Sequence, residues 1–234
     1  MQLPAVSGWP VTLMFLEPCY HRKRSTAPNT KEIMDPEQDR VGIFIDGSNL
    51  YHSLEENCGR MDLDFEGFVY KLLAGRSLFR TYYYNILQNG DRNPQGAQEQ
   101  QKFLASLYSI PRLEVRLGTT KYRGDQLVEK GVDIMVATDL LRYAWDDLYD
   151  VAILVSGDGD FAYAVQAVKD SGKYVEIAAF PANLSWDMAQ IADDRHFFDQ
   201  DYFKDLWVGS GRTQSGHRRR RRPPRKGPEG NPVG

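Results

Sequence analysis

The stretch VGIFIDGSNLY, residues 41–51, joins an apolar segment to a helix through a carboxylate. Residues 41–45 are apolar or glycine, the pattern of a strand that is covered on both faces. Asp46 follows at once, and Asn49 opens the helix predicted over 49–57, about one turn after the acid. An acid at the end of a core strand serves either to cap the next helix or to form part of a binding site.

Strand-like and helix-like segments alternate along most of the chain. Apolar runs rich in β-branched and aromatic residues predict strands, and apolar residues at helical spacing predict helices. The predicted strands are 41–45, 78–87, 113–122, 151–156 and 174–180, and the predicted helices are 49–57, 65–75, 95–110, 132–147, 160–172 and 184–193. This alternation predicts an α/β fold of right-handed βαβ units, with a mainly parallel central sheet between two layers of helices.

Composition limits the class of protein. A chain of 234 residues that is 41% hydrophobic can form one sizeable domain with appendages. Cys19 and Cys58 lie far apart, which argues against a disulfide framework and fits a reducing compartment. The apolar run 9–16 is too short to span a bilayer, and the basic cluster 21–24 follows it, the reverse of a signal peptide. We therefore expect a cytoplasmic protein without a membrane span.

The chain divides into three parts by composition. Residues 1–40 lack steady periodicity and are predicted to be a disordered lead, with Met34 as an alternative start of translation. Residues 41–208 form the predicted domain. Residues 209–234 are rich in Gly, Pro and Arg and carry eight Lys and Arg against one Glu, which predicts a disordered basic tail. Its segment 212–226 either keeps the protein soluble or contacts phosphates.

Carboxylates follow two of the predicted strands. Asp46 and Asp158 each end a strand, and Asp160 stands two residues further on. Ligands of parallel α/β sheets bind outside the carboxyl ends of the strands, so these acids are expected at one edge of the sheet. Asp133 falls in the first turn of a predicted helix. Helix capping, which contributes about 1 kcal/mol, explains Asp160 or Ser48 better than it explains Asp46 and Asp158 together with Asp133.

Asp139 is a further acid in an unusual place. It shares one face of the helix predicted over 132–147 with four apolar residues, Val132, Met135, Val136 and Tyr143. A buried carboxylate needs a partner or a metal ion, because burying it unpaired is costly. An ion pair with Arg142, three residues on, and a role in a site explain the acid equally well.

Clustered carboxylates repel one another unless a cation lies among them. Hard oxygen ligands without His or Cys suit Mg²⁺ or Mn²⁺, and the four histidines have no zinc-site spacing. Divalent ions held by acids mainly handle phosphate oxygens and activate water. Ser48, Asn49 and Ser156 are the neighbouring side chains that could hydrogen-bond a phosphate.

Three segments in this order and spacing resemble the NYN domain, in particular its bacterial LabA-like group. They are IFIDGSNLYHSL, KGVDIMVATDLL and ILVSGDGDFAYAVQAVKDSGKYVEI, and the resemblance covers about 41–200. It implies a PIN-like, Rossmann-like three-layer sandwich with an acidic metal pocket, and an Mg²⁺- or Mn²⁺-dependent ribonuclease activity.

The resemblance also assigns roles to residues. It implies that Asp46, Asp133, Asp158 and Asp160 are catalytic and metal-binding acids, that Asp139 is a further acidic position of the metal site, that Asn49 lies beside the first acid, and that Lys130 stands just ahead of Asp133. The apolar run that precedes Asp46 would then hold this acid rigidly at the site.

We therefore predict a metal-dependent endoribonuclease that hydrolyses phosphodiester bonds of single-stranded or structured RNA. Lys121, Arg123 and Lys130 are candidates for contacts with the RNA backbone, with ordinary solvated charge as the alternative. The competing function is an NYN-domain protein that binds RNA or a regulatory partner without cutting. Metal-dependent adhesion sites, sugar transferases and dehalogenase-type phosphatases share short strings with this chain but fit it less well. The RNA target, the cleavage polarity, activity on DNA and the oligomeric state, a homo-oligomer included, stay open.

Overall fold

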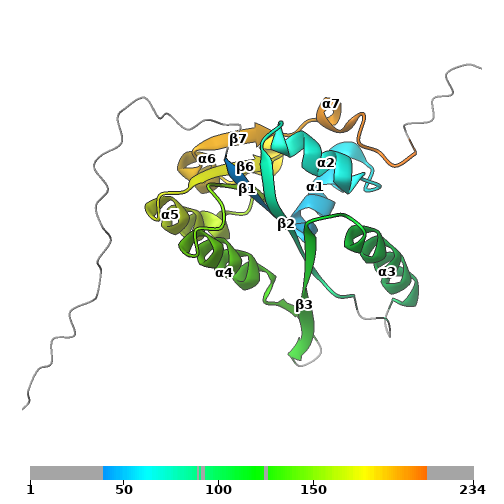
Figure 1. Ribbon diagram of the computed structural model, residues 1–234. Coiled ribbons are helices and arrows are strands. Elements are labelled where there is room, and N and C mark those ends of the chain that lie inside the picture. The colour runs from blue at the N-terminus through cyan, green and yellow to red at the C-terminus, as the bar shows by residue number, and fades with distance from the viewer. Residues whose placement is uncertain (1–38, 89, 91–92, 124–125, 210–234) are drawn as a thin grey trace, which may run out of the picture. The chain divides into compact units, whose positions relative to one another are not determined.

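The computed structural model describes residues 39–88, 90, 93–123 and 126–209 (Figure 1). The predicted lead, with its alternative start at Met34, lies outside the described residues except for Asp39 and Arg40. The predicted tail lies outside them except for Gly209, so the expectation for segment 212–226 has no structural counterpart.

The described strands form one seven-stranded sheet in the order β4-β3-β2-β1-β5-β6-β7. Their bounds are β1 Arg40–Asp46, β2 Ser77–Ile86, β3 Leu113–Arg123, β4 Gln126–Lys130, β5 Val151–Val155, β6 Tyr174–Ala179 and β7 Asp194–Phe197. All neighbouring pairs are parallel except β3 and β4, which form an antiparallel hairpin. The predicted mainly parallel sheet is confirmed, with β1 at its centre.

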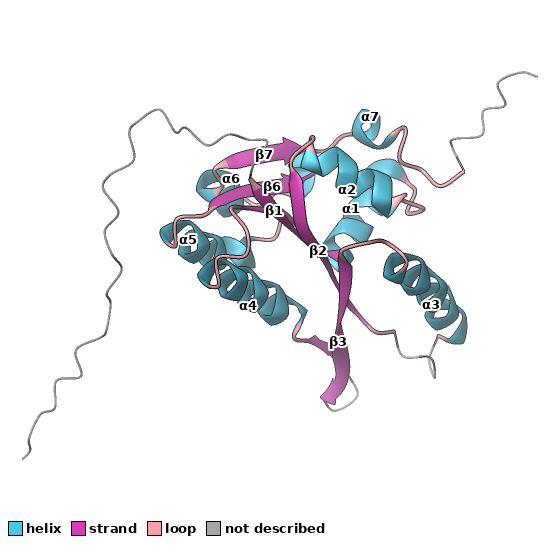
Figure 2. Ribbon diagram, in the orientation of Figure 1, coloured by secondary structure: helices cyan, strands magenta, loops and turns pink. Residues whose placement is uncertain are grey.

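Helices cover both faces of this sheet (Figure 2). Their bounds are α1 Gly47–Cys58, α2 Phe65–Leu73, α3 Pro94–Tyr108, α4 Val132–Trp145, α5 Ala162–Asp170, α6 Trp186–Ile191 and α7 Gln200–Phe203, with short 3₁₀ turns η1 Gly159–Phe161 and η2 Pro181–Asn183. One hydrophobic core lies between the sheet and α1, α2, α3 and α7, and the other between the sheet and α4, α5 and α6. The predicted three-layer α/β sandwich is thereby confirmed.

Strand β1 separates the two cores. Val41, Ile43 and Ile45 belong to the core under α1 and α2, and Phe44 belongs to the core under α4 and α5. Successive side chains of a strand alternate between faces, so Asp46 follows Phe44 onto the α4 side. The apolar pattern of this segment therefore reflects burial from both sides, and it fixes the position of the acid at its end.

Candidate active site

The ends of β1 and β5 bring two predicted motifs together. Ile45 pairs with Val155 in the parallel register, so Asp46 and Ser156 follow at neighbouring positions of the sheet edge. The Ser156 hydroxyl lies 3.3 Å from Oδ2 of Asp46 and donates to it. Both side chains are buried, with 4% of Asp46 and 1% of Ser156 exposed. The two segments are 110 residues apart in sequence, and the sheet alone makes them neighbours.

Asp46 is held by neutral donors. Its Oδ1 accepts from the Ser48 hydroxyl at 2.9 Å and from the backbone N–H of Asn49 at 3.1 Å. Asp46 is therefore the N-cap of α1, a role that the sequence had favoured for Ser48. Among the described residues, no Lys, Arg or His forms an ion pair with Asp46. Its charge is stabilised by dipoles rather than balanced by a protein cation.

Asp158 joins the same network through the loop after β5. Its backbone N–H donates to Ser156 Oγ at 3.2 Å, and its own Oδ1 accepts from the backbone N–H of Asp160 at 3.0 Å. Asp158, rather than Asp160, is thus the cap of η1. Capping thus accounts for Asp46 and Asp158 better than expected, whereas Asp133 is not a cap, because α4 begins after Gly131 without a side-chain cap. A cap uses one oxygen of Asp158, and capping is therefore compatible with a ligand at the other.

Gly47 and Gly157 allow the segments that follow β1 and β5 to pack closely against their neighbours. A side chain at Gly47 would lie 2.4 Å from the Tyr83 hydroxyl, and one at Gly157 would lie 2.0 Å from the backbone oxygen of Asn183. The Asn49 side-chain oxygen also accepts from the backbone N–H of Gly157 at 3.3 Å, which ties the two loops together. The glycines that follow Asp46 and Ser156 are therefore required by packing.

The remaining predicted residues lie around this pair. Asp133 is in the first turn of α4, as expected, and it is exposed. Asp160 is exposed in η1, against which α4 packs. The β3–β4 hairpin contains the three predicted basic residues, Lys121, Arg123 and Lys130. The structure describes only their backbone, and their side chains lie outside the described part.

Asp139 has partners that the sequence did not indicate. Its Oδ2 accepts from the Tyr84 hydroxyl at 3.0 Å and lies 3.2 Å from Nε of Arg116. The ion pair suggested with Arg142 is wrong, since Arg142 lies 3.7 Å from the Asp146 carboxylate instead. Burial, then the charge of Asp139 and the hydrogen bond to it, raise the pKa of Tyr84 well above its usual value. The buried Asp139 is thus compensated by a cation.

Tyr84 nevertheless connects Asp139 to the candidate site. Asp46 and Tyr84 are register partners at the carboxyl ends of β1 and β2. From α4, Asp139 therefore holds the hydroxyl of the tyrosine that pairs with Asp46 on the neighbouring strand. Neither Tyr84 nor Arg116 could be identified from motif spacing, because both contacts depend on how the strands are ordered.

The donors at this edge can be compared with what a divalent cation needs. The described residues contain no group of three His, Cys, Asp or Glu that could hold a metal ion. They do supply one buried carboxylate, Asp46, and a second, Asp158, on the same hydrogen-bonded network. Mg²⁺ usually binds one or two carboxylates and completes its shell with water and substrate phosphate. The donor set fits such a shared site better than an all-protein cage.

Comparison with known proteins identifies the family of this domain. The family profile of the NYN domain matches residues 40–201. The Low amplitude and bright protein LabA of Synechococcus elongatus is 23% identical over 159 residues, which cover 66% of this chain and 81% of that protein. A crystal structure of a protein of unknown function from Vibrio parahaemolyticus matches 75% of this chain and 100% of its own, with 25% identity and a TM-score of 0.60.

Within the described residues, no helix is both long and apolar enough to cross a membrane. The match to the profile spans β1 to α7, which includes both strand-end acids and the helix that carries Asp133 and Asp139. The chain belongs to the NYN domain family, whose members are generally nuclease-like, and within it to the LabA-like group.

Proposed function

We propose that this protein is a ribonuclease that uses Mg²⁺ or Mn²⁺ to hydrolyse phosphodiester bonds at the carboxyl edge of its sheet. One observation carries the proposal: Asp46 is a buried carboxylate that meets three neutral donors and, within the described residues, no cationic side chain. A buried charge without an opposite charge is costly, so its retention at a sheet edge favours a site that receives a cationic ligand.

In this proposal the acids have distinct tasks. Asp46 and Asp158 would hold the cation, with Asp160 and Asp133 as outer acids. A bound divalent ion would neutralise phosphate charge and lower the pKa of a water molecule. Ser156 keeps the two inner acids in register, because it donates to Asp46 and accepts from the backbone of Asp158.

Orientation of the Asp46 carboxylate is the main contribution of the protein around it. The Ser48 hydroxyl and the Asn49 N–H fix Oδ1, and Ser156 fixes Oδ2. A carboxylate held on both oxygens does not rotate freely, so it presents its remaining lone pairs in fixed directions. Such preorganisation lowers the reorganisation needed when charge develops on the phosphate.

Basic residues would hold the RNA backbone. Lys130 ends β4 one residue before Gly131 and three before Asp133, which places it beside the start of α4. We propose that Lys121, Arg123 and Lys130 contact phosphates from the β3–β4 hairpin, and that segment 212–226 adds salt-dependent affinity. Removal of 212–226 should then weaken RNA binding and flatten its dependence on salt.

Cleavage of labelled RNA and DNA oligonucleotides in Mn²⁺, in Mg²⁺ and in EDTA tests the proposal, with the Asp158→Asn protein in parallel. We expect cutting of RNA that needs the metal and that Asp158→Asn loses. Full activity in EDTA, or in the variant, would contradict the assigned site.

A second candidate function is an NYN-domain protein that binds RNA or a regulatory partner without cutting it. The absence of a three-acid metal group among the described residues favours this alternative. The same experiment separates the two functions, because a folded wild-type protein that binds RNA in every condition and cuts in none would be a binding module.

A further inference from the structure

A groove of about 770 Å³ opens between α1 and α3, beside the proposed active site. Three aromatic rings from α2, β2 and α3 line it, namely Phe65, Tyr83 and Phe103. The rings pack edge to face, with centroids 5.3 to 5.6 Å apart. Tyr51 of α1 also lines the groove and keeps 45% of its surface exposed. Ligand sites in proteins are commonly concave, aromatic and of this volume.

The polar groups of the groove suit a neutral ligand. Asn85 and Gln100 line it with amides, and both are fixed: Asn85 donates to the Tyr83 hydroxyl at 2.7 Å, and Gln100 donates to the backbone oxygen of Ile86 at 2.7 Å. The oxygens of Asn85 and Gln100 also accept, from the backbone N–H groups of Ile86 and Gln88. Each amide therefore keeps one hydrogen and one oxygen lone pair of fixed direction, which can pair with the edge of a planar heterocycle.

Charge in the groove argues against a phosphate ligand. The charged side chains that line it among the described residues are Arg60, Asp62 and Glu99. Arg60 is already engaged by Asp62 through two hydrogen bonds of 2.9 and 2.7 Å, which leaves Glu99 as excess negative charge. A sugar-phosphate backbone would be repelled there, whereas an uncharged ring would not.

Position connects the groove to the acids. Gly47 lines the groove and is the next residue after Asp46, so the first turn of α1 has the acid pair on one side and the groove on the other. A nucleic acid strand with a phosphate at Asp46 would therefore have a neighbouring base within reach of the aromatic rings.

We propose that this groove takes up one unpaired nucleobase of the substrate strand, which stacks against Tyr51 at the groove's exposed side. A base can enter only when it is not stacked and paired in a duplex, so the site selects single strands and loops. This inference rests on the proposed function, because that function supplies the phosphate at Asp46.

Equilibrium binding to short labelled RNA in Ca²⁺ tests the proposal, because Ca²⁺ takes oxygen ligands as Mg²⁺ does and keeps a cation between Asp46 and the phosphate. Denaturing gels after each titration check that the RNA is uncut. Two strands of about ten nucleotides have the same charge, and one of them has abasic ribose in place of its bases. We expect the wild type to bind the intact strand about tenfold more tightly than the abasic strand, the effect of one stacked base. Tyr51→Ala should lose this preference, and Tyr51→Phe should keep it because the ring remains.

Tyr108→Ala is the matched control, since Tyr108 is an exposed tyrosine of α3 that does not line the groove. Tyr51→Ala with the wild-type preference for intact over abasic RNA would overturn the inference. In another outcome the wild type prefers intact RNA, and Tyr51→Ala loses that preference, while no metal supports cleavage. That result would keep the inference and overturn the proposed nuclease. A DNA strand and an RNA duplex complete the panel, and equal binding of duplex and single strand would also overturn the groove as a base site.

Discussion

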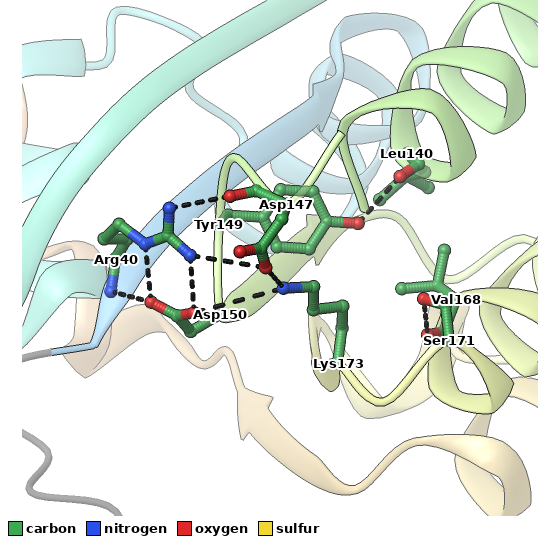
Figure 3. A network of polar contacts seen from close by, with 8 residues as sticks. All are labelled: Arg40, Leu140, Asp147, Tyr149, Asp150, Val168, Ser171 and Lys173. Atoms are coloured by element: carbon green, nitrogen blue, oxygen red, sulfur yellow. Dashed lines mark hydrogen bonds and ion pairs between the residues drawn. The ribbon is translucent and has the colours of Figure 1, made fainter. Parts of the chain in front are cut away.

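Aspartates at the two edges of the sheet have different kinds of partner. At the amino edge, where β1, β5 and β6 begin, Asp147 and Asp150 each meet a cation (Figure 3). Arg40 donates to Asp150 through Nε and Nη2, both at 2.8 Å, and Lys173 contacts Asp147. The hydrogen bond from Arg40, against an opposing effect of burial, lowers the pKa of Asp150 to about 2. These acids join the loops that precede the strands.

At the carboxyl edge the pattern reverses. Asp46 and Asp158 accept hydrogen bonds from hydroxyl and backbone N–H groups, and among the described residues neither has a cationic partner. The same residue type, on neighbouring strands of one sheet, is thus balanced at one end and unbalanced at the other. The difference supports the proposal that the carboxyl edge receives a ligand, whereas the charge pairs of the amino edge are expected to contribute to stability.

The largest expected effect comes from the same substitution made at each edge. Asp46→Asn should reduce RNA cleavage by about 100-fold or more, the range for removing one preorganised electrostatic group. Stability should change little, because Asn caps a helix about as well as Asp. The Asp150→Asn protein should cleave RNA at nearly the wild-type rate. Initial rates in Mn²⁺, with circular dichroism as the check on folding, measure both; equal rates for the two variants would remove the distinction between the edges.

Asp139 provides the next test, because it lies near the carboxyl edge but has a cation like the acids of the amino edge. Asp139→Ala leaves the buried Tyr84 hydroxyl and the half-buried Arg116 without this partner. We expect the free energy of unfolding to fall by about 2–3 kcal/mol, with cleavage per folded molecule little changed. Urea unfolding measures it, and Tyr84→Phe is the matched variant that removes only the hydroxyl. Loss of cleavage at unchanged stability would instead make Asp139 part of the metal site.

The fold could be predicted from sequence where burial left a clear pattern. Strand β1 is apolar because both faces are covered, and its pattern was clear in the sequence. Helix α1 begins at Gly47, two residues before the predicted start at 49, because Asp46 and not Ser48 is its cap. Strands β4 and β7 were not predicted from the sequence. Strand β7 has four residues, DRHF, none fully buried, and β4 has five, QLVEK, so neither shows the run or alternation of a core strand.

The site was predictable as far as strand topology determines it. Parallel strands that neighbour each other bring their carboxyl ends together, and this placed Asp46 beside the loop of Asp158. Spacing along one helix could only suggest Arg142 for Asp139. The real partners come from β2 and β3, and their contact depends on three-dimensional strand order. Whether an acid caps the next helix, and with which oxygen, likewise depends on backbone geometry that no motif specifies.

Ser156→Ala tests the carboxyl edge further, with a smaller expected loss of cleavage. Its hydroxyl donates to Asp46 and accepts from the Asp158 N–H, so Ser156→Ala frees one oxygen of the first acid and one N–H of the second. The loss of a hydrogen bond, worth about 1 kcal/mol, should reduce cleavage by about fivefold. Rates over a range of Mn²⁺ concentrations should show a higher metal requirement. Ser53→Ala, another buried serine, is the control, and an unchanged metal requirement in Ser156→Ala would mean that the serine does not position the acids.

The amino edge gives the smallest effect and a definite pH window. The folded pKa of Asp150, about 2, lies below the ordinary value near 3.8, so its pairing stabilises the fold above pH 4 and is lost as the pH falls toward 2. Because the pair is partly exposed, Asp150→Asn should cost about 0.5–1 kcal/mol at pH 7. Denaturant unfolding at pH 7, 4 and 2 should show this difference shrinking with acidity, most of it between pH 4 and pH 2, whereas Asp170→Asn, whose partner is the neutral Gln166, should show none. A difference that stayed undiminished at pH 2 would mean that Asp150 acts through its shape or hydrogen bonds, and not through the charge that distinguishes this edge from the other.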